Sequence, residues 1–158
     1  MAGGPFNLII CMNREIAVVD IDGTLCVVGD RRKYMEQNDP DWESFYRDDF
    51  NALPIRTVCD FVRQMSRHYD IFFCTSRRET VRQKTQIWLQ QNLLLSPKDY
   101  TLIMRPNSDN RPDVVSKIDS FTQETTEYER SHVAFVLEDS LAMAHRWREL
   151  GYRCFHVQ

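Results

Sequence analysis

The sequence predicts an α/β fold with a Rossmann-like, mainly parallel sheet and helices on both of its faces. Short apolar runs alternate along the chain with segments whose apolar residues recur at helical spacing. This alternation favours a parallel sheet, because each connecting helix crosses one face of the sheet and covers it. The chain has 158 residues, which is near the usual size of a single hydrophobic core. We therefore expect one domain.

The expected strands and helices alternate after a first strand and an insert. Apolar runs predict strands at residues 15–20, 70–75, 100–104, 133–138 and 153–157. Apolar stripes at helical spacing predict helices at about residues 55–65, 81–88, 114–121 and 143–150. An open sheet of this kind places its ligand site outside the carboxyl ends of the strands.

A polar and aromatic insert at residues 27–53 follows the first strand. It is too short for a large lid domain, so it predicts a small cap, made of a hairpin flap and a short helical insert, over an open site. Its aromatic residues could pack on the sheet or stack on bases, and its acidic residues would discourage extended contact with a nucleic-acid backbone. Residues 1–14 are expected to form an N-terminal segment before the domain at 15–158.

The most informative motif is Asp-Ile-Asp-Gly-Thr at residues 20–24, directly after the first apolar run. Side chains two residues apart in an extended segment point the same way, so Asp20 and Asp22 can face one substrate atom. Two close carboxylates favour a divalent cation, most simply Mg²⁺. A calcium loop is excluded, because its twelfth position would be Arg31 instead of Glu. A turn with solvated acids is the structural alternative for this motif taken alone.

Four motifs, in the right order, resemble those of the haloacid dehalogenase-like (HAD) phosphohydrolases. In the first motif, Asp20 and Asp22 match the nucleophile and the general acid/base. Thr75, at the end of the second predicted strand, matches the hydroxyl residue of the second motif. Lys117 matches the lysine that neutralises charge beside the nucleophile in the third motif. The resemblance implies a HAD-like fold and phosphate chemistry.

The fourth motif is an acidic pair, Glu138 and Asp139, at the end of another apolar run. Similar proteins usually carry two aspartates there, so Glu138 is a departure from the pattern. The resemblance implies Mg²⁺ as the cofactor. The candidate metal ligands are the acids of the first and fourth motifs, namely Asp20, Asp22, Glu138 and Asp139.

A narrower resemblance is to the phosphatase domain of phage polynucleotide kinase and its stand-alone relatives. The stretches that carry it are residues 32–34, 75–79 leading to Trp88, 104–117 and 147–152. Together with the acidic motifs, they cover the chain from about Glu15 onward. The sequence contains no Gly-x-x-x-x-Gly-Lys-Ser/Thr loop for a nucleotide phosphate, so we expect a phosphatase without a kinase.

Substrate contacts are expected from polar and cationic residues in or beside the motifs. The net charge of −3 gives no overall attraction to a polyanion, so any contact with nucleic acid must be local. Arginines in these segments could hold a second phosphate or a nucleotide. The candidate substrate-binding residues are Thr24, Arg32, Ser76, Arg77, Arg105 and Arg111.

The resemblance implies a Mg²⁺-dependent phosphomonoester hydrolase. In this scheme Asp20 forms an aspartyl-phosphate, Asp22 acts as acid and then base, and Thr75 and Lys117 hold the phosphoryl oxygens. The narrower resemblance favours the 3′-phosphate at a nucleic-acid end as the substrate. The modest charge leaves open a nucleotidase that acts on free nucleoside monophosphates. A third alternative is an inactive HAD-fold protein that binds phosphate, supported only by Glu138.

Cysteine usage and the N-terminal residues predict a cytoplasmic protein. The five cysteines form no Cys-x-x-Cys pair, which argues against a disulfide scaffold or a zinc site. Residues 1–13 lack a basic start and a long apolar stretch, so we expect neither a signal peptide nor a membrane span. The expected partner is a phosphorylated nucleotide or nucleic-acid end, and the sequence suggests no obligate protein partner.

Overall fold

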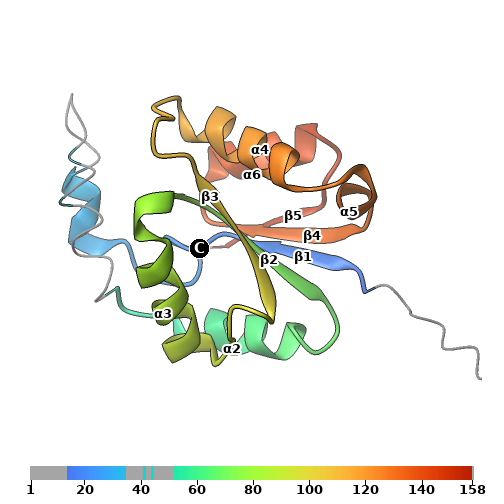
Figure 1. Cartoon of the computed structure of the whole chain (residues 1–158), viewed down its shortest axis with the longest axis horizontal. Helices are drawn as coiled ribbons and strands as arrows, with labels where there is room; N and C mark the ends of the chain where they lie inside the picture. Colours follow the sequence, from blue (N-terminus) through green and yellow to red (C-terminus); the bar gives the residue numbers. More distant parts are fainter. Residues whose placement is uncertain (1–13, 35–40, 42–43, 45–51, 158) are drawn as a thin grey trace, which may run out of the picture.

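Five parallel strands form the central sheet of the computed structural model, which describes residues 14–34, 41, 44 and 52–157 (Figure 1). In spatial order they are β3 (Tyr100–Arg105), β2 (Asp70–Arg78), β1 (Ile16–Val19), β4 (Val133–Glu138) and β5 (Cys154–His156). Each strand pairs in parallel with its neighbours. The predicted α/β fold with a parallel sheet is confirmed.

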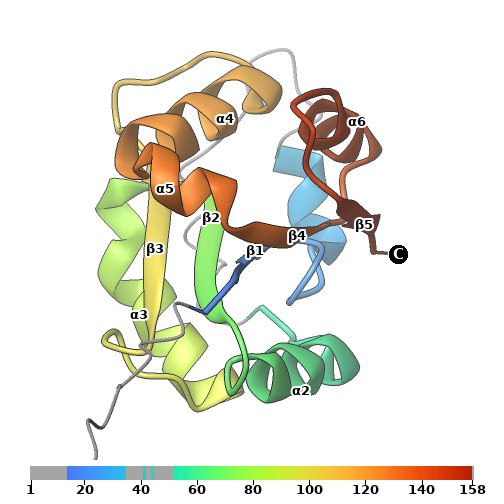
Figure 2. The ribbon, with the colours of Figure 1, turned by 90° about the vertical axis from the view of Figure 1, so that its right-hand side faces the viewer.

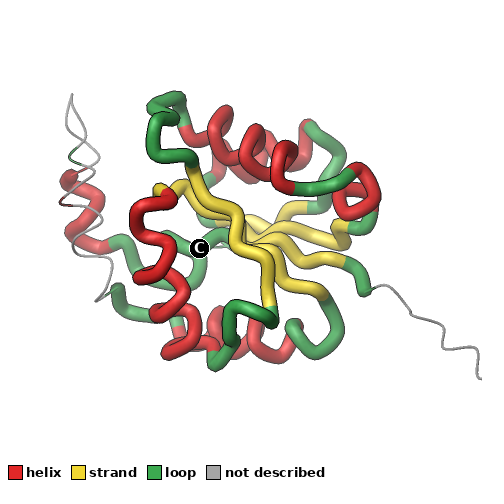
Figure 3. Tube along the Cα trace, in the orientation of Figure 1, coloured by secondary structure: helices red, strands yellow, loops and turns green. Residues whose placement is uncertain are grey.

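Helices cover both faces of this sheet, as the sequence predicts (Figures 2 and 3). The helix α2 (Arg56–Met65) and the helix α3 (Arg82–Leu93) lie on one face. The other face carries α4 (Asp113–Glu124), α5 (Glu127–Ser131) and α6 (Leu141–Glu149). In the part of the chain that the structure describes, no helix has the length and apolar character needed to cross a membrane.

The central strand β1 is buried on both sides, which explains its continuous apolar sequence. Ala17 and Val19 belong to the core under α2 and α3, whereas Ile16 and Val18 belong to the core under α4 and α6. This alternation follows from the two-residue period of a strand. Because β1 is anchored on both faces, the residues that follow it leave the sheet at a fixed place.

Two elements differ from the sequence prediction. Strand β2 continues three residues past Thr75, because Arg78 pairs with Arg105 of β3 after an irregularity in the register. Its Ser-Arg-Arg ending has the composition of a loop, which hides this continuation. Helix α5 has no buried residue and hence no apolar stripe, but a capping box between Thr126 and Glu129 starts it.

The insert after β1 is closed at its base by backbone pairing. Cys26 forms an isolated antiparallel bridge with Pro54, and the amide of Val27 donates to the carbonyl of Leu53 at 2.8 Å. A 3₁₀ helix, η1 (Gly29–Tyr34), provides a helical turn within the insert. Most of the predicted flap lies outside the described residues, as do residues 1–13. The hairpin flap and the domain boundary at residue 15 therefore stay predictions.

Candidate active site

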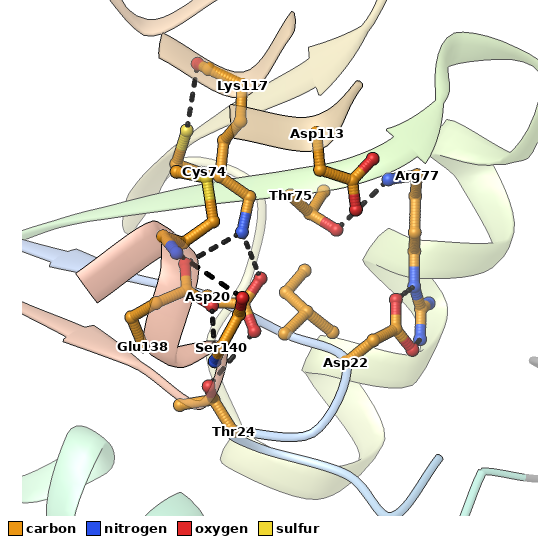
Figure 4. A network of polar contacts seen from close by, with 12 residues as sticks. Asp20, Asp22, Thr24, Cys74, Thr75, Arg77, Asp113, Lys117, Glu138 and Ser140 are labelled. Atoms are coloured by element: carbon orange, nitrogen blue, oxygen red, sulfur yellow. Dashed lines mark hydrogen bonds and ion pairs between the residues drawn. The ribbon is translucent and has the colours of Figure 1, made fainter. Parts of the chain in front are cut away.

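The four motifs meet at the carboxyl edge of the sheet (Figure 4). Asp20 directly follows β1, and its amide donates to the carbonyl of Leu137 in β4 at 3.0 Å. Thr75 lies in β2 and Glu138 ends β4, while Lys117 reaches the same place from α4. Residues far apart in the sequence are thus brought together because parallel strands end at one edge.

Asp20 is held from both sides by hydrogen bonds. The ammonium of Lys117 donates to Oδ1 of Asp20 at 2.7 Å, and the hydroxyl of Thr24 donates to Oδ2 at 3.0 Å. Lys117 also donates to Oε2 of Glu138 at 2.9 Å. The backbone amide of Ser140 donates to the other oxygen of Glu138 at 3.1 Å. Both oxygens of Asp20 and both oxygens of Glu138 are therefore engaged.

Burial and charge act together on this network. Burial raises the pKa of Asp20 well above its usual range, and the Glu138 carboxylate adds to this effect, while Lys117 opposes it. Burial alone would lower the pKa of Lys117, but the carboxylates of Asp20 and Glu138 raise it well above its ordinary value. Burial and Glu138 also raise the pKa of Asp139. One buried ammonium faces three acids, which leaves an excess of negative charge.

Three of the four predicted metal ligands form one cluster. Asp20, Glu138 and Asp139 each offer a carboxylate oxygen, and these oxygens lie within 4.8 Å of one another. No side chain fits at position 23 without a shift of Asp139, because a Cβ on Gly23 would lie 2.0 Å from a carboxylate oxygen of Asp139. Oxygen donors of this kind fit Mg²⁺. The residues present therefore fit the cofactor that the resemblance implies.

Asp22 lies apart from this cluster, because its carboxylate is held by Arg77. Nε and a terminal nitrogen of Arg77 donate to the two oxygens of Asp22 at 2.7 and 2.9 Å. The other terminal nitrogen donates to the hydroxyl of Thr85 at 3.2 Å. Burial would lower the pKa of Arg77, but Asp22 raises it above its ordinary value, so Arg77 stays cationic. The side chain of Asp22 is thus held by Arg77 and does not belong to the cluster of Asp20, Glu138 and Asp139, so metal ligation by Asp22 stays a prediction.

Two residues predicted to bind substrate, Thr24 and Arg77, hold the motif acids in this structure. Arg77 is buried and bonded to Asp22, and the hydroxyl of Thr24 is fully buried against Asp20. A contact of either side chain with substrate stays a prediction. Thr75 is buried too, and its hydroxyl accepts a hydrogen bond from the amide of Arg77 at 3.2 Å. Ser76 is half-buried next to it.

The remaining arginines predicted to bind substrate are Arg105, Arg111 and Arg32. Arg105 is buried and forms an ion pair with Asp113. Arg111 is exposed and forms ion pairs with Asp109 and Asp119. The side chain of Arg32 lies outside the described part of the chain. A substrate contact by any of these three arginines stays a prediction.

No role is predicted for Asp113 from the sequence, yet Figure 4 draws it with the residues of the candidate site. Its side chain is half exposed, and it starts helix α4 one turn before Lys117. Residues four apart on a helix share a face, so the spacing of Asp113 and Lys117 could have shown that both reach this edge. The buried Arg105 fixes the orientation of Asp113.

A comparison with protein families gives one match that spans nearly the whole chain. The family described as "Polynucleotide kinase PNKP phosphatase domain" matches residues 14–158. No curated protein matches the sequence.

Solved structures share the fold. A chain of the Pnkp1/Rnl/Hen1 RNA repair complex is 24% identical, with a TM-score of 0.71 over 92% of this chain. The match covers 43% of that chain, so the present chain spans less than half of its length. A haloacid dehalogenase-like hydrolase from Streptococcus pneumoniae is 15% identical, with a TM-score of 0.58 over 92% of this chain and 85% of the other.

A third solved structure is a HAD family enzyme from Bacteroides thetaiotaomicron in complex with magnesium and inorganic phosphate. It is 10% identical, with a TM-score of 0.52 over 92% of this chain and 94% of the other. At these identities, the solved structures establish the fold alone.

Proposed function

Since the chain belongs to the family of the polynucleotide kinase PNKP phosphatase domain, and is thus a HAD-superfamily phosphatase, we propose that it hydrolyses the 3′-phosphate at a nucleic-acid end. The observation that carries the proposal is the separation of the two motif acids. Asp20 lies with Lys117 and Glu138, whereas Asp22 lies with Arg77. Two carboxylates in different surroundings can take the different roles of nucleophile and acid/base.

In the proposed reaction, a carboxylate oxygen of Asp20 attacks the phosphorus of the monoester. The bond to the leaving oxygen breaks, and Asp22 gives that oxygen a proton. Asp22 then takes a proton from the water that hydrolyses the aspartyl-phosphate. Lys117 and the hydroxyl of Thr75 stabilise the charge on the phosphoryl oxygens. Arg77 keeps Asp22 in place through two hydrogen bonds.

Mg²⁺ would be held by Asp20 and Asp139, with Glu138 beside them. When bound, it would supply positive charge that stabilises the transferring phosphoryl group. We assign direct ligation to Asp139, because its side chain is partly exposed beside Asp20, whereas Glu138 is buried and bonded to Lys117 and to the amide of Ser140. Glu138 then orients Lys117. A similar fold whose structure holds magnesium and inorganic phosphate supports Mg²⁺ as the cofactor.

The nucleic-acid substrate is supported by the family and by the similar chain in an RNA repair complex. A nucleotidase that acts on free nucleoside monophosphates is the second candidate. It is favoured by one observation: the described arginines predicted to bind substrate, Arg77, Arg105 and Arg111, each form an ion pair with an aspartate. The cytoplasmic location and the lack of an obligate protein partner stay predictions.

The test is phosphate release from 3′-phosphorylated DNA and RNA oligonucleotides and from deoxynucleoside monophosphates, with Mg²⁺ and with a chelator. We expect faster release from an oligonucleotide, complete dependence on Mg²⁺ and no release by Asp20→Asn. Faster release from the monophosphates would replace the proposal by a nucleotidase. Asp139→Asn should raise the Mg²⁺ concentration at half-maximal rate by about tenfold or more, and more than Glu138→Gln does.

A further inference from the structure

A pocket of about 510 Å³ opens beside the metal-binding acids, on the side toward β5. Gly23 and Asp139 belong both to this pocket and to the candidate active site. The remaining lining includes four apolar side chains, those of Val27, Val28, Ile55 and Val157. Its volume falls in the range of about 300–1,000 Å³ that small-molecule sites occupy. The pocket, here called the valine pocket, is therefore continuous with the catalytic residues and large enough for a ligand.

Backbone hydrogen bonds fix the walls of the valine pocket. The amide of Val27 donates to Leu53 at 2.8 Å, and the amide of Val157 donates to Glu138 at 2.9 Å. A third lining residue, Ile55, donates to Leu25 at 2.7 Å. The walls are thus anchored to the sheet and to the start of α2, so a ligand would meet a pocket that is already formed.

The described lining of the valine pocket has few polar side chains. Nε2 of His156 lies 2.8 Å from the carbonyl oxygen of Asp139 and donates to it, because a carbonyl can only accept. The described lining contains neither lysine nor arginine, so a second phosphate would find no cation of this kind there. A flat ring would find apolar walls.

We propose that the valine pocket binds the base of the terminal nucleotide whose phosphate is removed. This inference rests on the proposed function and names the part of the substrate that the chain recognises. The base lies against Val27, Val28 and Val157, while its phosphate lies at Asp20. Because the described lining carries neither lysine nor arginine for a second phosphate, we expect recognition to centre on the last nucleoside.

The test uses three substrates: an oligonucleotide with a 3′-phosphate on an ordinary nucleotide, the same oligonucleotide with an abasic terminal sugar, and p-nitrophenyl phosphate. Loss of the base should raise KM about tenfold, the size expected for one stacked base. Val27→Ala should raise KM for the ordinary end about fivefold, from the lost methyl contacts. It should leave KM for the other two substrates unchanged.

Val115→Ala is the matched control, because Val115 is exposed to a similar extent as Val27 but lies on α4. It should change none of the three KM values. Equal wild-type KM values for the ordinary and abasic ends would overturn the inference, as would an equal effect of Val27→Ala on both. Release from p-nitrophenyl phosphate alone, with none from either oligonucleotide, would instead overturn the polynucleotide function and this inference with it.

Discussion

Two clusters in this molecule each place one cation between two acids, and the exposure of that cation differs sharply between them. Lys117 lies 2.7 Å from Asp20 and 2.9 Å from Glu138. Arg111 lies 2.8 Å from Asp109 and 2.6 Å from Asp119. The side chain of Lys117 is 4% exposed, whereas that of Arg111 is 51% exposed.

This difference shows that distance alone does not rank ion pairs. Charges in water are screened, so an exposed pair contributes little to stability. Buried charges lose their hydration and depend on one another, so removing one leaves the others uncompensated. The cluster around Lys117 therefore holds an excess of negative charge, which favours a cation, while the cluster around Arg111 orders the loop before α4.

Replacing the buried cation should give the largest effect. Lys117→Met leaves Asp20 and Glu138 buried without their shared donor. We expect kcat to fall by about 10³-fold and the free energy of unfolding to fall by about 3–5 kcal/mol. Steady-state kinetics and urea unfolding measure these changes. A variant that keeps wild-type kcat would contradict the role of Lys117 in the reaction.

An intermediate effect is expected at Arg77, which holds Asp22. Arg77→Lys keeps the charge but cannot make two parallel hydrogen bonds to the Asp22 carboxylate. With an oligonucleotide, kcat/KM should fall by about 10²-fold. With p-nitrophenyl phosphate the fall in kcat/KM should be smaller, because kcat/KM reports formation of the aspartyl-phosphate and that leaving group needs no proton. Equal falls in kcat/KM with both substrates would reject the positioning role.

The smallest effect is expected in the exposed cluster. Hydrogen bonds from Arg111 hold the pKa of Asp109 well below its usual range. A lowered folded-state pKa stabilises the protein above the unfolded pKa of about 3.9, and this stability is lost as the pH falls through the folded value. Arg111→Met should raise the pKa of Asp109 toward about 3.9, as measured by NMR titration, and change activity less than twofold. A large loss of activity would mean that Arg111 binds substrate.

The sheet could be predicted because its signals are local. The apolar run at residues 133–138 has the same bounds as β4, and the run after residue 15 gives β1 to within a residue at each end. The end of β2 could not be predicted, since Arg77 and Arg78 have the composition of a loop. Arg77 is buried in a strand only because Asp22, 55 residues earlier, compensates its charge.

The site could be predicted in part. Asp20, Lys117, Glu138 and Asp139 come together as the motifs indicate. The sequence did not show that Thr24, Arg77 and Arg105 each bond to an aspartate. A polar side chain beside a motif looks the same whether it faces the substrate or another residue. The ion pair of Asp113 with Arg105 could not be predicted for the same reason.

The sequence by itself determined the order of strands and helices and the identity of the motif acids, because periodicity and short motifs are properties of neighbouring residues. The tertiary structure decided which side chains bind one another: Lys117 with Asp20 and Glu138, and Arg77 with Asp22. Those pairs join residues 21 to 97 positions apart. They form because parallel strands end at one edge of the sheet, and because a buried charge is stable only beside its partner.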